Sequence, residues 1–189
     1  MAQYNGYRYV SHNSYNAWRA AVLGNGYNVD YSFGNQCWDL VALLYWQYGL
    51  SLITRPGGNG TAEDCWYRSR QANSKPPFIS LTGKENIRRG DILVWSAGNM
   101  QNATGHIAFA DMNYSQRNSR GQIQCLGQGQ GSSVTNIVWI GTNIIGIFRN
   151  TKWDSTPSPE PTPTPTTTTK RDNFPWPVAW KHWPNFKRK

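Results

Sequence analysis

The chain has 189 residues and a formal net charge of +9, and it contains 10 tryptophans and 10 tyrosines. This length accommodates one domain with a substantial hydrophobic core, plus an appendage. The mean hydropathy is −0.65, and no apolar run approaches the roughly 20 residues of a transmembrane helix, which excludes a membrane-spanning class.

The first half of the chain is predicted to be helical. Apolar residues at helical spacing, bounded by capping residues and glycines, indicate helices at 15–23 and 37–48. A third helix is expected from Thr61 through Arg70, because Asp64 follows Thr61 at the spacing of a capping box.

The second half changes to the pattern of strands. Short apolar or alternating runs, separated by Gly, Asn and Ser clusters, occur at 91–95, 106–110, 122–126, 135–140 and 144–148. Helices followed by strands predict an α+β fold, in which N-terminal helices pack on a small antiparallel sheet.

After Trp153 the composition changes sharply. We expect a domain at 1–153, a disordered Pro/Thr-rich linker at 154–170 and a cationic aromatic tail at 171–189. The tail interleaves tryptophans with lysines and arginines, a composition that suits anionic wall polymers or a membrane surface. A terminus without function, or a fragment of a larger binding module, is the alternative for this segment.

The cysteines and the amino terminus bear on the compartment. Three cysteines do not build a disulfide framework and favour a reducing compartment, although a pair between Cys65 and Cys125 is left open. The first residues lack the layout of a secretory signal, so we expect no export by that route.

Cys37 begins the second predicted helix. The unpaired N–H groups and the dipole of a helix start favour an anion, so we expect a lowered thiol pKa and a nucleophilic thiolate. The N–H of Cys37 is also aimed to stabilise the oxyanion of a tetrahedral intermediate. A buried structural cysteine is an equally common explanation of this pattern taken alone.

A cysteine nucleophile requires a base, and the chain has three histidines. His12 and His182 lie near the two ends of the chain, whereas His106 opens a predicted strand that can pack against the helix start. We therefore expect His106 to be the base. A half-buried strand histidine without function is the alternative.

Three sequence blocks, at 34–40, 90–95 and 105–110, together resemble the CHAP family of cysteine- and histidine-dependent amidohydrolases and peptidases of phage endolysins and wall hydrolases. The resemblance implies a papain-like α+β fold and cleavage of peptidoglycan amide bonds. It also implies Cys37 as the nucleophile and His106 as the general base and then acid. Gln36 would help to place the oxyanion.

The chain departs from the family at the third catalytic position. CHAP domains usually carry a Glu or an Asn in a segment resembling Leu-Glu-Gln-Asn, whereas Gly127 and Gly129 stand at those two places here. Gln128, or Gln124 after a register shift, could supply a neutral acceptor for His106.

A possible calcium loop precedes the cysteine. Asn28, Asp30, Ser32, Gly34 and Asp39 have the spacing of calcium ligands, although the sixth position is not glycine. The segment also reads as a turn rich in Asx residues. It is similar to the calcium-binding segment of several phage CHAP domains, which implies Asn28, Asp30 and Asp39 as side-chain ligands, with Ser32 or Gly34 adding an oxygen.

Two function classes follow from the sequence. The first is a phage lysin that hydrolyses Gram-positive peptidoglycan, as an amidase or an endopeptidase, and stays in the host cytoplasm until lysis or belongs to the virion. The second is a catalytically weakened wall-binding or structural component of a virion. We expect peptidoglycan as the partner of a monomeric protein, without nucleic acid.

Overall fold

The fold was analysed in a computed structural model that describes residues 3–4, 6–56, 60–97, 104–129, 133–140 and 143–153, with the backbone alone at 3–4 and 135–140. The predicted linker (154–170) and tail (171–189) lie outside the described residues.

The described residues form helices and strands in the following chain order: β1 (Gln3–Tyr4), β2 (Tyr7–Arg8), α1 (Tyr15–Val22), α2 (Cys37–Gln47), α3 (Asp64–Tyr67), α4 (Arg70–Asn73), β3 (Phe78–Leu81), β4 (Ile92–Trp95), β5 (His106–Ala110), β6 (Ile123–Gly127), β7 (Thr135–Ile140) and β8 (Ile144–Asn150). Single 3₁₀ turns occur at Lys84–Asn86 and Tyr114–Gln116.

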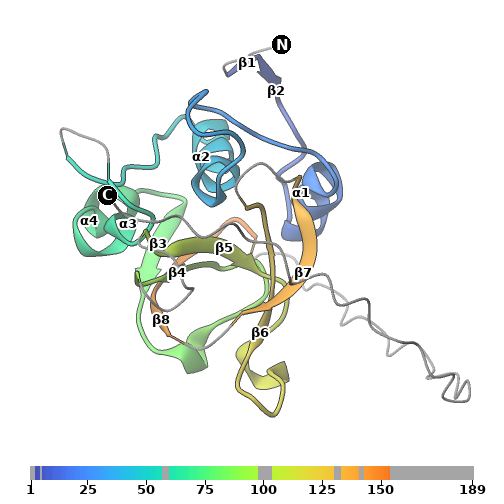
Figure 1. The fold of residues 1–189 in the computed structure, drawn as a ribbon, viewed down its shortest axis with the longest axis vertical. Coiled ribbons are helices and arrows are strands. Elements are labelled where there is room, and N and C mark those ends of the chain that lie inside the picture. Colours follow the sequence, from blue (N-terminus) through green and yellow to red (C-terminus); the bar gives the residue numbers. More distant parts are fainter. Residues whose placement is uncertain are drawn as a thin grey trace, which may run out of the picture. The chain divides into compact units, whose positions relative to one another are not determined.

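Strands β3 to β8 build one antiparallel sheet in the order β3-β8-β4-β5-β6-β7. Helix α2 lies against β5, near the middle of this sheet (Figure 1). The predicted α+β fold is therefore confirmed. Strand β5 carries His106 at its first position, and the helix that packs against this strand begins at Cys37.

The two faces of the sheet contribute to different parts of the core. Ile107 and Phe109 pack with the helices, whereas Ala108 and Ala110 belong to a second apolar cluster. This alternation follows from the two-residue period of a strand. Cys65, on α3, belongs to the first cluster and Cys125, on β6, to the second, and both thiols are free. The open possibility of a disulfide between them is thus wrong.

The helices at 15–23 and 37–48 are confirmed to within a residue, but the third predicted helix is wrong as a single element. It divides into α3 and α4 at Ser69, whose hydroxyl donates to the carbonyl of Thr54 at 3.0 Å. A serine that bonds to another segment competes with continued helix. The interaction expected at the start does form, because the Asp64 carboxylate accepts both the N–H and the hydroxyl of Thr61.

All five predicted strands are present, two of them with the predicted bounds and three with ends that differ by one or two residues. The sequence did not predict β1, β2 or β3. Strand β3 has four residues and follows the prolines at 76 and 77, so it carries too little periodicity to be recognised. It is recruited to the sheet edge by pairing with β8.

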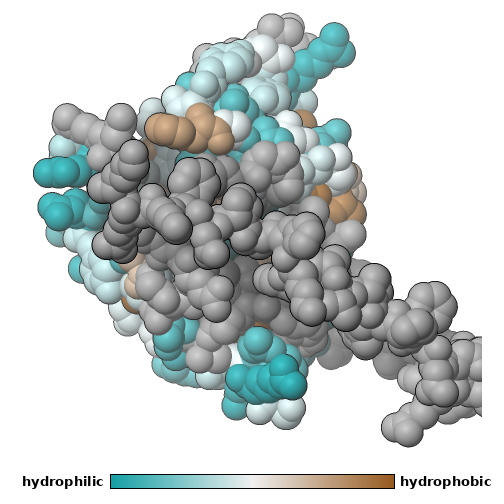
Figure 2. Space-filling model, in the orientation of Figure 1, coloured by the Kyte–Doolittle hydropathy of each residue, from teal (hydrophilic) through white to brown (hydrophobic). Residues whose placement is uncertain are grey.

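Among the coloured residues in Figure 2, the hydrophobic ones form small, separate patches beside hydrophilic ones. No helix in the described part of the chain is long and apolar enough to cross a membrane.

Candidate active site

Cys37 is the first residue of α2, and it packs, partly buried, against the first apolar cluster, which contains Ile107 and Phe109. The helix begins here because Gln36 is extended and its N–H donates to the Asp39 carboxylate at 2.7 Å, a reciprocal bond typical of a helix start. The sequence therefore places the cysteine where the first backbone N–H groups have no partner within the helix.

Two buried side chains fix the loop that leads into Cys37. The Asp39 carboxylate accepts the N–H of Val29 at 2.8 Å, in addition to that of Gln36. The Gln128 amide accepts from the N–H of Tyr27 at 3.2 Å and donates to the carbonyls of Tyr27 and Gln36. The loop from residue 27 to residue 36 is thus tied both to α2 and to the end of β6.

This arrangement corrects the predicted role of Gln128. Its amide group is occupied by the backbone of Tyr27 and Gln36, so it positions the cysteine loop and does not orient His106. The alternative, Gln124, lies at the other end of the strand pair, where its carbonyl accepts from the N–H of Asp111. Position 124 lies opposite Asp111, and Asp111 is five residues along the chain from His106, so a side chain at 124 is well beyond hydrogen-bond reach of the imidazole.

His106 opens β5 beside the cysteine. The backbone N–H of Ile107, the residue that follows His106, lies close enough to the Cys37 thiol to lower its pKa. No hydrogen bond joins Cys37 to His106 among the described residues. Catalytic hydrogen bonds are often long in the free enzyme and tighten when substrate binds. The structure thus brings the predicted nucleophile and base to one place without linking them directly.

The position next to the His106 ring is occupied by a glycine. A Cβ added at Gly127 would lie 3.9 Å from Nε2 of His106 and 3.1 Å from the Cβ of Ala108. A longer side chain at 127 would therefore face the imidazole, which is the place where the family resemblance expected an acid. Within the described residues, neither nitrogen of the His106 ring has a hydrogen-bond partner, and the Trp95 ring packs against it at 5.6 Å between centroids.

Burial sets the protonation of both groups. It raises the pKa of the Cys37 thiol, although the backbone N–H groups of Ile107, Trp38 and Cys37 oppose the shift. Burial also lowers the pKa of His106 to about 4. The expected lowering of the thiol pKa is therefore wrong, because desolvation outweighs the helix start. Near neutral pH the resting pair is a thiol and a neutral imidazole.

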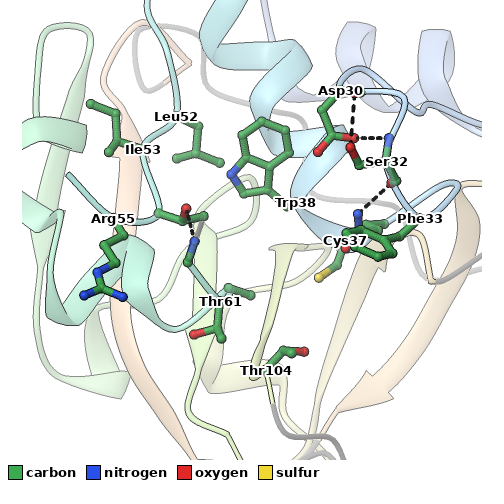
Figure 3. A pocket seen from close by; sticks show the side chains of 14 residues that line it. Asp30, Ser32, Phe33, Cys37, Trp38, Leu52, Ile53, Arg55, Thr61 and Thr104 are labelled. Carbon is green, nitrogen blue, oxygen red and sulfur yellow. Dashed lines mark hydrogen bonds between the residues drawn. The ribbon is translucent and has the colours of Figure 1, made fainter. Parts of the chain in front are cut away.

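A pocket of about 460 Å³ opens beside Cys37 (Figure 3). Cys37 and Trp38 form one side of it, and segments 52–55 and 60–62 form the other. The lining also includes Asp30, Ser32, Phe33, Gln36 and Thr104. A substrate bound in this pocket would lie beside Cys37.

The predicted oxyanion role of Gln36 stays a prediction. Its amide nitrogen donates one of its two hydrogens to the carbonyl of Ser32 at 2.9 Å, which leaves the other for an oxyanion. The backbone N–H groups of Cys37 and Trp38, which help to lower the pKa of the thiol, are further donors for an oxyanion.

The predicted calcium ligands were tested against their contacts. Asp30 is exposed and bonds the N–H of Ser32, while Asp39 already accepts two backbone N–H groups. The Oδ1 atom of Asn28 is buried and has no partner among the described residues. These residues fit a calcium ion for two reasons. The carboxylate oxygens of Asp30 and Asp39 keep free lone pairs, and the Oδ1 atom of Asn28 is an acceptor without a hydrogen bond among the described residues. The described residues contain no group of three or more His, Cys, Asp or Glu that could hold a metal.

Sequence reasoning missed three residues at this site. Trp95 packs on His106, the indole of Trp38 lines the pocket, and Arg55 lies across the pocket from Cys37 (Figure 3). Only Trp38 offered a local signal, by its place next to the cysteine. The other two reach the site through long-range packing.

Comparison with known proteins gives one matching family and two similar solved structures. The model of the CHAP domain family matches residues 26–129. The chain is similar to the crystal structure of a wild-type endolysin, LysIME-EF1, with 18% identity and a TM-score of 0.52 over 72% of this chain and 63% of that chain. It is also similar to the crystal structure of Ly7917, with 15% identity and a TM-score of 0.49 over 74% and 63%.

The chain thus spans less than two thirds of the length of either solved structure. No curated protein matched it. At this level of identity, the likeness to LysIME-EF1 supports the α+β fold alone.

The low pKa of His106 predicts a pH-dependent stability. Between pH 6.5 and about 4 the unfolded chain binds a proton that the folded chain does not, so the free energy of unfolding falls as the pH falls through this window. Denaturant unfolding at several pH values should show this slope in the wild type and a smaller slope in His106→Gln. Equal slopes in the two proteins would contradict the assignment.

Proposed function

Because the chain belongs to the CHAP domain family, we propose that it is a peptidoglycan hydrolase that cleaves amide bonds with Cys37 as its nucleophile. One observation carries this proposal: Cys37 begins a helix, lines a pocket and lies against the backbone beside His106. A buried structural cysteine would need neither the pocket nor the histidine.

In the proposed first step, the neutral imidazole of His106 takes the proton of the Cys37 thiol as the sulfur attacks the carbonyl carbon. The C–S bond forms, and the carbonyl oxygen becomes an oxyanion. Backbone N–H groups at the start of α2 stabilise this oxyanion. Because the resting pair is neutral, the charge separation arises only when substrate is present.

In the second step, the imidazolium donates its proton to the leaving amine as the C–N bond breaks. The product is an acyl-thioester on Cys37, which water hydrolyses with His106 again acting as the base. Trp95 keeps the ring in place by packing during these transfers.

At the finer level, we propose a phage lysin that attacks Gram-positive walls as an N-acetylmuramoyl-L-alanine amidase or an endopeptidase. The host cytoplasm before lysis stays a prediction from the sequence. A specific observation favours a second candidate, a weakened wall-binding component of a virion: Gly127 provides no side chain to orient His106.

Loss of the sulfur distinguishes the two candidates. Cys37→Ala should lower the rate of dye release from purified Gram-positive walls by at least about a thousandfold, because no other group can form the thioester. Cys125→Ala is the matched control, since that thiol lies in the second apolar cluster, away from the pocket. Wild-type and Cys37→Ala proteins that release dye equally slowly would exclude the enzyme and leave the binding component.

We also propose that Asn28, Asp30 and Asp39 hold a calcium ion, with an oxygen from Ser32 or Gly34. The ion would supply a fixed positive charge to the loop that leads into Cys37. The side chains themselves already bond the loop backbone, so the ion would add rigidity to an ordered segment.

Calcium at millimolar concentration should therefore raise the melting temperature by a few degrees, and a chelator should reverse the change. Asn28→Ala with Asp30→Ala should abolish the response, whereas Glu85→Gln, which removes an exposed carboxylate elsewhere, should keep it. A calcium response that survives in the double variant would refute the site.

The tail at 171–189 is proposed to hold the protein at anionic wall polymers or membranes. A chain that ends at residue 170 should bind walls or anionic vesicles less tightly and cleave a soluble muropeptide at the wild-type rate, because the tail adds attachment and no chemistry. Co-sedimentation at low salt measures the binding, and unchanged binding of the shortened chain would contradict this role.

A further inference from the structure

The wall of the pocket that faces Cys37 carries one cation. Among the described lining residues, Arg55 is the only lysine or arginine. Figure 3 places Arg55 and Cys37 on opposite sides, with Trp38 and Thr61 between them. The negative lining residue, Asp30, lies on the Cys37 side. The pocket therefore has a positive end remote from the sulfur.

The backbone that presents Arg55 is held by buried polar groups. The Asn73 amide, which is fully buried, accepts the N–H of Ile53 at 2.8 Å and donates to its carbonyl at 2.7 Å. Ser69 donates to the carbonyl of Thr54, and the Thr54 hydroxyl accepts the N–H of Gly60 at 3.1 Å. The segment before Arg55 is thus fixed to α3 and α4, so little ordering remains to be done on binding.

The guanidinium of Arg55 has no partner among the described residues. Arg55 is exposed and makes no ion pair or hydrogen bond with another described residue. In contrast, Arg19, Arg89 and Arg149 each pair with an aspartate. An arginine presents a planar fork of donors that matches a carboxylate in two parallel hydrogen bonds.

A second donor lies between Arg55 and the sulfur. The Nε1 atom of Trp38 is buried and has no hydrogen-bond partner among the described residues, while the residue lines the pocket. A buried indole N–H usually has an acceptor, and a peptide carbonyl in the pocket would provide one. The pocket thus offers a donor for a backbone carbonyl and, further from Cys37, a donor pair for a carboxylate.

We infer that Arg55 binds a free carboxylate of the peptide substrate and thereby selects acidic stem peptides over their amidated forms. This inference rests on the proposed function, because it assigns the pocket beside Cys37 to the substrate. The carboxylate lies at the Arg55 end and the scissile amide over the sulfur, which fixes the direction of the peptide. Peptides in which the carboxylate is a carboxamide lose the charge and one acceptor, so they bind more weakly.

The test uses two soluble muropeptides that differ only in a carboxylate or a carboxamide on the acidic stem residue. Binding is measured by calorimetry with full-length Cys37→Ala, which cannot turn the peptides over. The carboxylate form should bind about tenfold more tightly, a ratio expected for one charged hydrogen-bonded pair at a partly open site. High salt should reduce the ratio.

Arg55→Gln in the Cys37→Ala background should bring the ratio to about one, whereas Lys75→Gln, which removes an equal charge from an exposed site outside the pocket, should leave it unchanged. Equal binding of the two peptides by Cys37→Ala, or a preference that survives Arg55→Gln, would overturn the inference. Failure of the proposed function would appear separately, as absence of cleavage by the protein that retains Cys37.

Discussion

The active site depends on how the loop before α2 is held. Gln128 bonds the backbone at both ends of this loop, and Asp39 bonds it from within the helix. Together they attach the loop to β6 and to α2, so that the helix can begin only at Cys37. Both side chains are buried, and a buried polar group that lost its partners would cost about 1–3 kcal/mol. The hydrogen bonds of Gln128 and Asp39 therefore hold the loop against the sheet and the helix, and they determine where the sulfur of Cys37 lies.

The same burial determines the chemistry. A cysteine at a helix start is commonly an ion-pair partner of its histidine, but here desolvation raises the pKa of Cys37 and lowers that of His106. The pair is neutral at rest, which makes proton transfer part of the attack on the substrate. Gly127 leaves the ring without a polar partner on that side. Packing by Trp95 replaces a hydrogen bond as the constraint on the ring.

Local pattern was sufficient to identify Cys37 and His106, because a helix start and a strand start each have a signature within a few residues. The third position was not predictable in this way. Residues 127 and 128 are neighbours in sequence, yet Gly127 lies beside the His106 ring and Gln128 bonds the loop before Cys37. A shift of one residue in a strand exchanges its faces, and the sequence does not fix which face is used. The α+β class was predictable because the periodicity of helices and strands is a local property of the sequence. The role of Arg55 was not predictable, because contacts with α3 and α4, which are distant in sequence, place the segment before it in the pocket wall.

In the proposed reaction the sulfur of Cys37 forms a covalent bond to the substrate. Intact-mass spectrometry of protein quenched in acid during wall digestion can detect this bond. We expect an added mass that maps to Cys37 and disappears as digestion ends. Undiminished digestion by protein whose Cys37 is fully alkylated, with no added mass on the native protein, would contradict it.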